Sequence, residues 1–291
     1  MLAREPAVNL AIGPMCPVRC EGCYNHFGNT AGGPGLVTAA EVIGFAGAAR
    51  AEGVGQATLS GGDPLFHPEL TAITAGLAGL GMRVKVDTVG TALIGPARIV
   101  YKGRGRAAPV DVADLAPHVG FVAVPLDGAR QETVEAFRRG RGNLLAETRA
   151  VAGLLRGAGI PFGYNTVAST ANLPELPAIG ALAAEDGAAE WQVFEYDPGG
   201  PNPSARKPRL RLGPGEFAAA TAGLKAGPGV RVTCKSLDDR DGAYFLVDDS
   251  GQAWKPAGAG LRRVFGHITS DRPAVMAALA QHVADVRAAA V

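Results

Sequence analysis

The sequence predicts an α/β protein whose core is a partial (β/α)6 barrel, followed by a C-terminal β extension and a terminal helix. Two observations lead to this prediction. Six short β-rich segments alternate with helical patterns, which is typical of βα units in a parallel sheet. After residue 228 this alternation stops, and strand-like segments follow one another directly. The six predicted strands are residues 8–12, 56–59, 83–87, 120–124, 161–167 and 191–196.

Helical segments separate the predicted strands. Residues 38–51 begin with Thr38 and carry Glu41 three positions later, which is the pattern of a capping box. Residues 143–155 also have a helical pattern. The connection between the third and fourth strands is unusually long and contains the segment YKGRGR at 101–106, and long loops of this kind are often functional. Further helices are expected after Pro68, Gln131, Pro174 and Pro214.

The chain from residue 229 onward is expected to extend the sheet without adding another βα unit. Strand patterns at 229–235 and 243–247 precede a hairpin turn at 248–251, which leads to a strand at 252–255. Ser270 is expected to cap a final amphipathic helix, with Pro273 in its first turn. We therefore expect a barrel core at residues 1–228 and an extension at 229–291 that packs on the barrel mouth.

Composition and charge exclude several classes of protein. The 291 residues include 28 Lys+Arg and 27 Asp+Glu, so the formal net charge is +1 and a nucleic-acid-binding surface is not indicated. The hydrophobic share of 47% excludes a disordered chain. No apolar run approaches the roughly 18 residues of a membrane span, and the first residues lack the pattern of a signal peptide. We expect a cytoplasmic enzyme with no membrane or nucleic-acid partner.

Three of the four cysteines, Cys16, Cys20 and Cys23, lie close together after the first predicted strand. A tight cysteine cluster in a long chain favours metal binding over disulfides. The loop lies at the C-terminal mouth of the predicted barrel, where barrel active sites lie. Three thiolates can hold three irons of a [4Fe–4S] cluster and leave the fourth iron open for chemistry. The alternative is a non-catalytic zinc-binding protein, in which His26 would be the fourth ligand.

The cysteine spacing Cys-x3-Cys-x2-Cys, together with the segment SGGDP at residues 60–64, resembles the radical SAM superfamily. The resemblance implies that S-adenosylmethionine (SAM) binds the open iron of a single cluster. It also implies that an electron, from a reductant of the flavodoxin or ferredoxin type, cleaves SAM to a 5′-deoxyadenosyl radical that abstracts a substrate hydrogen. One departure from the family pattern is Gly22, where an aromatic residue usually precedes the third cysteine. Tyr24 is therefore expected to supply the adenine contact.

The resemblance also assigns SAM contacts at the strand ends. Gly61 and Gly62 would let the backbone approach the methionine amino group, because a side chain there would collide with it. An arginine is expected to meet the methionine carboxylate, and Arg139 is preferred to Arg138 and Arg141. The remaining cofactor contacts implied by the resemblance are Asp63, Asp87, Thr88 and Asp127, with Asn165 and Val167 on the adenine side.

Cys234 is the one cysteine outside the loop and ends a predicted strand beside the barrel mouth. A thiol there could return a hydrogen atom to the opposite face of a substrate radical, which is epimerisation. This arrangement resembles single-cluster radical SAM epimerases of the neomycin epimerase type, which act on aminoglycosides in antibiotic biosynthesis. Tyr244 is a second candidate hydrogen donor or substrate contact, and Glu195 is expected to point into the barrel. The alternative for Cys234 is a small buried hydrophobe.

Residues 235–249 hold five aspartates against Lys235 and Arg240, a local balance of −3. An acidic mouth favours a cationic substrate such as an amino sugar. Two other enzyme classes remain open. One is a radical SAM dehydrogenase of a sugar alcohol or aminocyclitol, which would give a second electron to the cluster. The other resembles viperin, a nucleotide dehydratase, with Lys102, Arg104 and Arg106 as phosphate contacts.

Overall fold

The computed structural model describes residues 5–23, 37–198, 208–258 and 261–289. Six parallel strands, adjacent in chain order, form the centre of a ten-stranded sheet. Each predicted bound of these strands lies within one residue of the observed one, and the partial-barrel architecture is confirmed. The six strands are β1 (Ala7–Ala11), β3 (Gln56–Ser60), β4 (Arg83–Asp87), β7 (Phe121–Pro125), β9 (Phe162–Ala168) and β10 (Glu190–Glu195).

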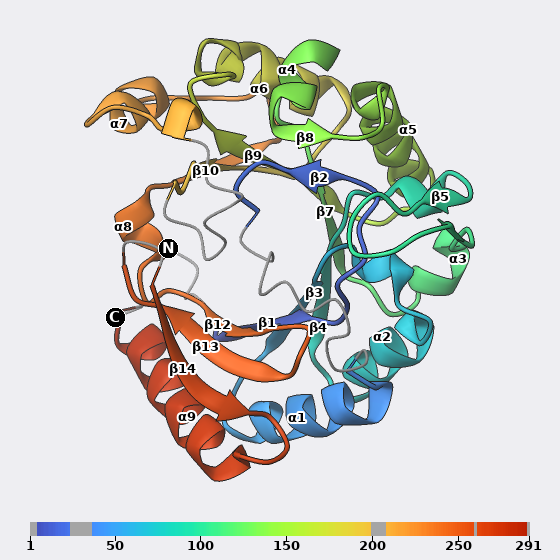
Figure 1. Cartoon of the computed structure of the whole chain (residues 1–291), viewed down its shortest axis with the longest axis vertical. Coiled ribbons are helices and arrows are strands. Elements are labelled where there is room, and N and C mark those ends of the chain that lie inside the picture. The colour runs from blue at the N-terminus through green and yellow to red at the C-terminus, as the bar shows by residue number, and fades with distance from the viewer. Residues whose placement is uncertain (1–4, 24–36, 199–207, 259–260, 290–291) are drawn as a thin grey trace.

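Helices cover the outer face of the curved sheet (Figure 1). The predicted capping box is present at the first of them, where the Thr38 side chain accepts a hydrogen bond from Glu41 N and Thr38 N donates one to Glu41 Oε2. The helices of this layer are α1 (Ala39–Ala51), α2 (Leu70–Gly79), α3 (Val112–Leu115), α4 (Gln131–Phe137), α5 (Leu144–Gly157), α6 (Leu176–Glu185) and α7 (Glu216–Thr221). Short 3-10 turns lie at Pro64–Phe66, Thr91–Leu93, Leu173–Glu175 and Pro208–Leu210.

Side chains alternate along the strands and so divide the sheet into a packed outer face and a polar inner face. On β1, Val8 and Leu10 are buried in the main hydrophobic core, whereas Ala7 and Asn9 line an internal cavity. The same alternation places Thr58 and Lys85 on the cavity wall. Burial of the outward aliphatic side chains holds the sheet to its helices, at roughly 25 cal/mol per Å² of apolar surface.

The expectation that no further βα unit follows β10 is wrong. Strand β11 (Arg231–Lys235) follows α7 and pairs in parallel with β10, so it continues the barrel. The physical reason is that a helix lies between the two strands and returns the chain, which allows parallel pairing. The chain then returns to the first strand of the barrel, where β12 (Phe245–Val247) pairs in parallel with β1. In the strand order, β11 and β12 therefore lie on opposite sides of the six core strands.

The predicted hairpin is present and consists of β12 and β13 (Gln252–Pro256), which pair antiparallel. Strand β14 (Arg262–His267), which is not among the predicted strands, pairs antiparallel with β13. The short helix α8 (Leu237–Arg240) lies between β11 and β12. The terminal helix α9 (Arg272–Ala288) has Asp271 rather than Ser270 at its N-cap, so the predicted cap is one residue early. Its residues Val275 and Leu279 are buried in the same core as Val8. The boundary at residues 228 and 229 stays a prediction.

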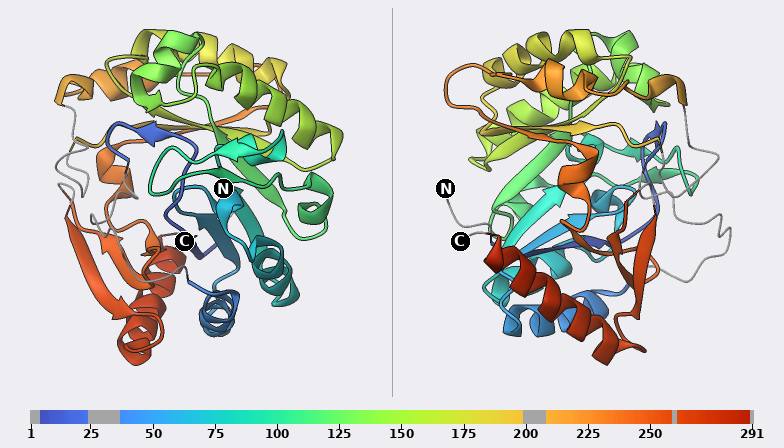
Figure 2. Two further views of the ribbon diagram at one scale, coloured as in Figure 1. Left: turned by 45° about the vertical axis from the view of Figure 1, so that its right-hand side comes forward. Right: turned by 90° about the vertical axis from the view of Figure 1, so that its left-hand side faces the viewer.

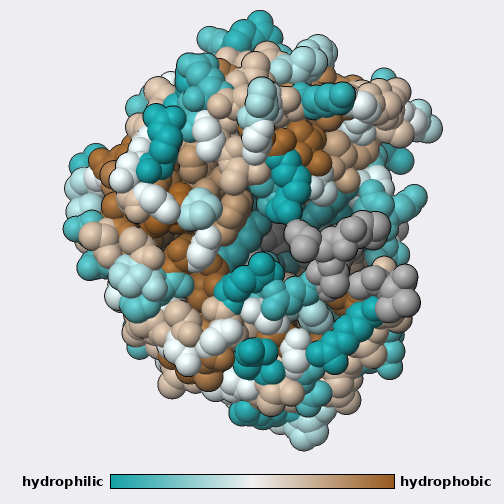
Figure 3. Space-filling view, turned by 180° about the vertical axis from the view of Figure 1, so that it is seen from behind, coloured by the Kyte–Doolittle hydropathy of each residue, from teal (hydrophilic) through white to brown (hydrophobic). Residues whose placement is uncertain are grey.

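Two small two-stranded ribbons are separate from the ten-stranded sheet, which curves through the molecule (Figure 2). Strand β2 (Arg19–Cys20) pairs antiparallel with β8 (Arg138–Arg139), and β5 (Ala97–Arg98) pairs antiparallel with β6 (Arg106–Ala107). In the described part of the chain, no helix has the length and apolarity needed to cross a bilayer. The face opposite to that of Figure 1 mixes hydrophilic and apolar side chains (Figure 3).

Candidate active site

Three cysteines of the loop after β1 line an internal cavity of about 910 Å³. Cys16 is fixed by backbone hydrogen bonds with Tyr101: Cys16 N donates to Tyr101 O at 3.1 Å and Tyr101 N donates to Cys16 O at 3.0 Å. Cys20 lies in β2 and is held by the pairing with β8. Burial raises the pKa of both Cys16 and Cys20 thiols, and the Arg138 guanidinium opposes this effect at Cys20. The third thiol, Cys23, is half-buried.

The two glycines after β3 pack directly against the cysteine loop. Gly62 N donates to Gly13 O at 2.7 Å, and Asp63 N donates to Met15 O at 2.7 Å. A Cβ on Gly61 would lie 2.4 Å from Gly13 O, and one on Gly62 would lie 2.3 Å from Met15 O. The structure therefore gives a further reason for these glycines, because the loop backbone already excludes a side chain. Both glycines also line the cavity, and their predicted approach to the methionine of SAM stays a prediction.

Asp63 is a buried link between strand ends and does not line the cavity. Its carboxylate accepts hydrogen bonds from Thr88 Oγ1 at 2.6 Å, Val89 N at 3.0 Å and Leu65 N at 3.0 Å. Thr88 and Asp87 do line the cavity, and Asp87 Oδ1 lies 3.2 Å from Lys85 Nζ. The geometry thus gives Asp63 the role of holding Thr88 in place, while Asp87 and Thr88 are accessible to a ligand.

Arg138, rather than the predicted Arg139, faces the cysteines. Its guanidinium forms an ion pair with the buried carboxylate of Asp127 and donates a hydrogen bond to Cys20 Sγ at 3.2 Å. The Arg138 side chain is 15% exposed and lines the cavity. Strand pairing explains this placement, because Arg138 is directly opposite Cys20 in the β2–β8 ribbon and both point inward.

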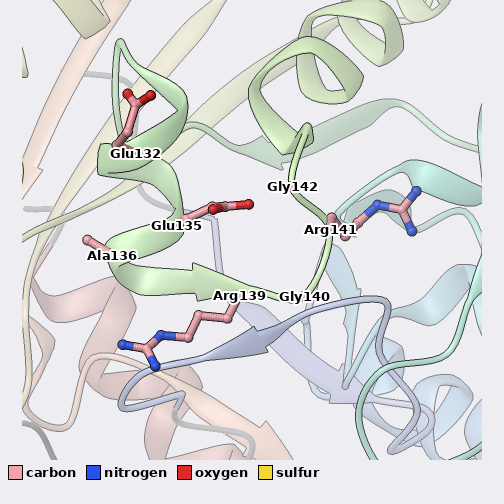
Figure 4. Close-up of a pocket in the computed structure, with 7 residues that line it drawn as sticks. All are labelled: Glu132, Glu135, Ala136, Arg139, Gly140, Arg141 and Gly142. Atoms are coloured by element: carbon pink, nitrogen blue, oxygen red, sulfur yellow. The ribbon is translucent and has the colours of Figure 1, made fainter.

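Arg139 points outward from the same ribbon. Its side chain is 54% exposed and lies 3.1 Å from a Glu21 oxygen. Together with Glu132, Glu135 and Arg141 it lines a separate outer pocket of about 540 Å³, where Arg139 and Arg141 point in different directions (Figure 4). The preference for Arg139 is therefore not supported by the geometry, and Arg138 takes its place as the candidate carboxylate contact.

Asn165 and Val167 lie on the inner face of β9 and line the cavity. The Asn165 Oδ1 atom is buried without a hydrogen-bond partner in the described structure. Val167 N donates to Asp127 Oδ1 at 2.7 Å, so Asp127 organises the backbone as well as Arg138. A buried amide oxygen without a partner is costly in a folded protein, which indicates that a ligand group or water completes it.

The sequence profile of the radical SAM superfamily matches residues 10–174. The chain belongs to the radical SAM superfamily. The AdoMet-dependent heme synthase of Methanosarcina barkeri is 37% identical over 142 residues, covering 49% of this chain and 37% of that protein. The PqqA peptide cyclase of Xanthomonas campestris pv. campestris is 29% identical over 195 residues, covering 64% of this chain and 46% of the cyclase. The chain thus spans less than half the length of these relatives.

Solved radical SAM structures share the fold at low sequence identity. Streptococcus suis SuiB bound to its precursor peptide SuiA aligns with a TM-score of 0.68 and 9% identity, covering 99% of this chain and 67% of SuiB. The structure of anSMEcpe with bound AdoMet aligns with a TM-score of 0.65 and 13% identity, covering 95% of this chain and 80% of that one. The neomycin epimerase resemblance is not supported by these comparisons.

The radical SAM family uses a [4Fe–4S] cluster and SAM, and the residues present fit both groups. All three cysteines line the same cavity, whose volume of about 910 Å³ is large enough for a nucleoside-sized ligand, and the residue with the unsatisfied oxygen, Asn165, lines it as well. Within the described ranges, no three His, Cys, Asp or Glu side chains are placed to share one metal ion. A [4Fe–4S] cluster does not need such a group, because each cysteine binds a different iron. Tyr24, the predicted adenine contact, and His26, on which the zinc alternative depended, lie outside the described residues.

Cys234 does not face the radical SAM cavity. It lies in β11 one residue before Lys235, which lines the cavity, so its side chain points to the opposite face of the sheet. Burial raises the pKa of the Cys234 thiol, and a hydrogen bond with Thr221 of α7 opposes this effect. The side chain packs against the hydrophobic core. The geometry matches the packing alternative rather than the predicted role as hydrogen donor.

Glu195 is also turned away from the cavity, contrary to the prediction. Its carboxylate accepts a hydrogen bond from Leu237 N at 3.0 Å, and its backbone oxygen accepts one from Arg240 at 2.7 Å, so it fixes the start of α8. The neighbours Gln192 and Phe194 point inward instead. The even-numbered residues of β10 thus face inward, whereas the prediction for Glu195 required the odd-numbered ones to do so.

Tyr244 does line the cavity, as do several residues that the sequence analysis missed. Lys235 Nζ lies 5.5 Å from the Tyr244 ring centroid and donates to Gln192 Oε1 at 2.8 Å. Strand alternation is the signal that could identify Gln192 and Lys235 as cavity-lining residues. It does so only if their neighbours Trp191 and Cys234 are assigned to the packed face. No comparable sequence signal points to Arg138, because its position depends on the pairing of β2 with β8.

The acidic mouth that was predicted from residues 235–249 is not formed. Asp239 closes a capping box with Ser236, Asp248 accepts the turn hydrogen bonds of Ser250, and Asp249 lies 3.7 Å from Lys102. Of this run, Asp241 alone is among the described cavity-lining residues, which include seven Lys or Arg and five Asp or Glu. A preference for a cationic substrate is therefore not supported.

The viperin-like phosphate site is not supported either. Among residues 101–106, only Tyr101 lines the described cavity. Arg104 and Arg106 are exposed on the outer surface of the β5–β6 connection. A triphosphate held by this segment would lie outside the cavity that the cysteines line.

Proposed function

We propose that this radical SAM enzyme oxidises a small polar substrate by two electrons, as a dehydrogenase or an oxidative coupling enzyme does. The observation that carries the proposal is the direction of Cys234. Redox-neutral epimerisation needs a hydrogen-atom donor at the substrate, and the one thiol outside the cysteine loop points away from the cavity. Loss of a second electron from the substrate radical requires no such donor.

When bound, the cluster and SAM supply a 5′-deoxyadenosyl radical that takes one hydrogen atom, and the oxidised cluster can accept one electron from the substrate radical. The remaining proton leaves to solvent, so the substrate loses two hydrogen nuclei and two electrons in total. The protein's contribution is to bind and orient. Cys16, Cys20 and Cys23 would hold the cluster, Arg138 would meet the SAM carboxylate, and Asn165 would bond the adenine side.

The cavity wall favours a substrate with many hydrogen-bonding groups. Asn9, Thr58, Lys85 and Gln192 place amide, hydroxyl and ammonium groups on its inner surface. A sugar alcohol, an aminocyclitol and a short peptide backbone all fit this chemistry. The relatives support a peptide substrate, since the names of a related protein and of a structural neighbour refer to peptides.

Epimerisation remains the second candidate, with Tyr244 in place of Cys234 as hydrogen donor. The observation that favours it is that Tyr244 lines the cavity, beside Lys235. A phenol can give up its O–H hydrogen to a carbon radical, although the tyrosyl radical must then be reduced again. An aminoglycoside epimerase of this kind would need no thiol in the site.

Mass spectrometry of products formed in heavy water tests the two candidates. The anaerobically reconstituted enzyme is incubated with SAM, dithionite and a panel of aminocyclitols, aminoglycosides and short peptides. A product lighter by about two mass units, formed together with 5′-deoxyadenosine, is the expected result. A product heavier by about one unit at carbon would mean that an exchangeable donor returned the hydrogen, and two-electron oxidation would be wrong.

The variant Tyr244→Phe, with Cys234→Ala as its matched partner, assigns the donor if a heavier product is found. Loss of deuterium incorporation in Tyr244→Phe alone would identify the phenol. Loss of deuterium incorporation in Cys234→Ala alone would identify the Cys234 thiol as the hydrogen donor. Under two-electron oxidation, neither variant changes the mass of the product.

We also propose a cytoplasmic location with a reductant of the flavodoxin or ferredoxin type. All four cysteines are free thiols in this structure. Free thiols and a cluster with an open iron persist in a reducing compartment, which supports this location.

A further inference from the structure

Four exposed arginines lie on the cysteine loop and on the β5–β6 ribbon, which hydrogen-bonds to that loop. We define the basic patch as Arg19 of β2, Arg98 of β5, Arg106 of β6 and Arg104 between the last two strands; all four side chains are exposed. The sequence from residue 88 to 110 contains no Asp or Glu. Within the described residues, none of the four forms an ion pair, whereas the nearby Arg139 and Lys102 pair with Glu21 and Asp249.

Two members of the basic patch face each other across a two-stranded ribbon. Arg98 and Arg106 are direct partners in the antiparallel pairing of β5 with β6. Like charges directly opposite in such a pair destabilise it. The ribbon has only two residues in each strand, so it has little pairing energy to offset this repulsion. An anionic partner would relieve the repulsion on binding.

The basic patch is joined to the cysteine loop by backbone hydrogen bonds. Val100 N and Tyr101 N both donate to Cys16 O, at 2.9 and 3.0 Å. Arg19 directly precedes Cys20 in β2, so it belongs to the cysteine loop itself. A protein bound to these arginines would therefore lie against the outer side of the residues that hold the cluster.

We propose that the basic patch is the docking surface for an acidic one-electron carrier of the ferredoxin or flavodoxin type. The inference rests on the proposed function, which requires the cluster to be reduced. The carrier loses one electron and the cluster gains it, with no bond formed and no proton transferred. Opposite charges on the two surfaces would raise the rate of encounter and orient the carrier toward the cysteine loop.

Binding of a strongly acidic ferredoxin to the reconstituted enzyme tests the docking surface. The double variant Arg98→Glu/Arg106→Glu is compared with Arg50→Glu/Arg287→Glu, which has the same change of charge on α1 and α9. These helices lie at the bottom of Figure 1, away from β5. We expect the dissociation constant to rise on the order of tenfold in the patch variant and by less than about twofold in the control. Added salt should weaken wild-type binding.

Electron exchange gives a second readout. The cluster is reduced with dithionite, freed of reagent, and mixed with oxidised ferredoxin, and the rate is followed by ferredoxin absorbance. We expect a slower second-order rate in the patch variant, while dithionite reduces all variants equally because a small reductant needs no docking surface. Equal ferredoxin affinity and equal rates in the patch and control variants would overturn the proposal. So would a larger loss of affinity for an acidic peptide or an RNA than for ferredoxin.

The single variant Arg106→Glu separates docking from folding. It places an opposite charge across from Arg98, so we expect a higher Tm together with weaker ferredoxin binding. A lower Tm with unchanged binding would give the arginines a structural role and overturn the proposal. If the wild type forms no 5′-deoxyadenosine even with dithionite, the proposed function fails, whereas the binding result stands by itself.

Discussion

At the scale of single residues, Arg138 and Arg139 are adjacent in sequence and opposite in role. Arg138→Ala removes the partner of the buried Asp127 carboxylate and the hydrogen bond to Cys20 Sγ. We expect it to lower the free energy of unfolding by about 3–5 kcal/mol, because a buried charge is left unpaired. Arg139→Ala breaks an exposed pair with Glu21 and should cost less than about 1 kcal/mol.

Denaturant unfolding, with SAM binding by calorimetry on the folded fraction, checks this comparison. Arg138→Lys serves as a second variant, since it keeps the charge near Asp127 and should fold while binding SAM more weakly. Normal SAM affinity in both Arg138 variants, with a loss in Arg139→Ala, would return the carboxylate contact to Arg139.

His282 makes stability depend on pH. Burial, reinforced by Lys255, lowers its pKa to about 4, against roughly 6.5 in an unfolded chain. Between these values the unfolded state binds the proton and the folded state does not. Stability is therefore complete above about pH 6.5 and falls as pH decreases toward 4, by roughly 3 kcal/mol from this residue. Unfolding of His282→Gln should show a smaller decrease over that range, and parallel pH profiles for the two proteins would contradict the assignment.

The candidate site was predictable from the sequence where one local segment defines it. Cys16, Cys20 and Cys23 are close in sequence, so any compact loop brings them together. The predictions for Arg139 and Cys234 are wrong because the direction of a side chain on these strands depends on a partner strand far away in sequence. For Cys234 the information was present in part, since Lys235 and Cys234 cannot both face inward on one strand.

At the scale of elements, the turn after β3 and the cysteine loop form one packed unit. Gly62→Ala would place a Cβ 2.3 Å from Met15 O, so we expect the loop to shift, stability to fall by about 1–3 kcal/mol and the iron content after reconstitution to decrease. The matched control is Gly44→Ala in α1, where a Cβ meets nothing within 4 Å. It should raise stability by roughly 0.4–1 kcal/mol.

Iron content per chain, measured beside denaturant unfolding, checks both variants. Full iron content in Gly62→Ala would show that the loop tolerates the added methyl group. In that case the predicted reason for the glycine, close approach to the methionine of SAM, would account for it alone, and we would expect SAM affinity rather than iron content to change.

The elements themselves were predictable because alternation and capping are local signals. All six core strands and the Thr38 cap were expected within one residue. Strand β11 was expected as a strand, but its parallel pairing with β10 was not, because strand direction is set by the path of the chain between the two strands. The pairing of β12 with β1 joins segments more than 230 residues apart, and no local pattern indicates it.

At the scale of the whole molecule, the last 60 or so residues complete the barrel core rather than cover it. β12 pairs with β1, and Phe245, Val275 and Leu279 share the main hydrophobic core with Val8. We expect a fragment of residues 1–228 to lose cooperative unfolding and near-ultraviolet circular dichroism, because it exposes that core. A fragment that unfolds cooperatively near the Tm of the full chain would support the predicted boundary at 228 and 229.

The charge of the cavity also belongs to this scale, and the sequence could not show it. The aspartates after residue 235 are adjacent in sequence, but local turns and caps use most of them. Cations from β4, β11 and β14 meet in the interior instead. A count along the sequence therefore gave the wrong sign for the site, since the sheet gathers residues from distant segments.

The most direct test of the account is 5′-deoxyadenosine formation by the wild type, Cys20→Ala and Cys234→Ala, each reconstituted anaerobically and supplied with SAM, dithionite and substrate. We expect Cys20→Ala to form none, because the cluster loses a ligand, and Cys234→Ala to match the wild type in both 5′-deoxyadenosine and product. Product formation that survives in Cys20→Ala, or that is lost in Cys234→Ala while SAM cleavage continues, would contradict the account.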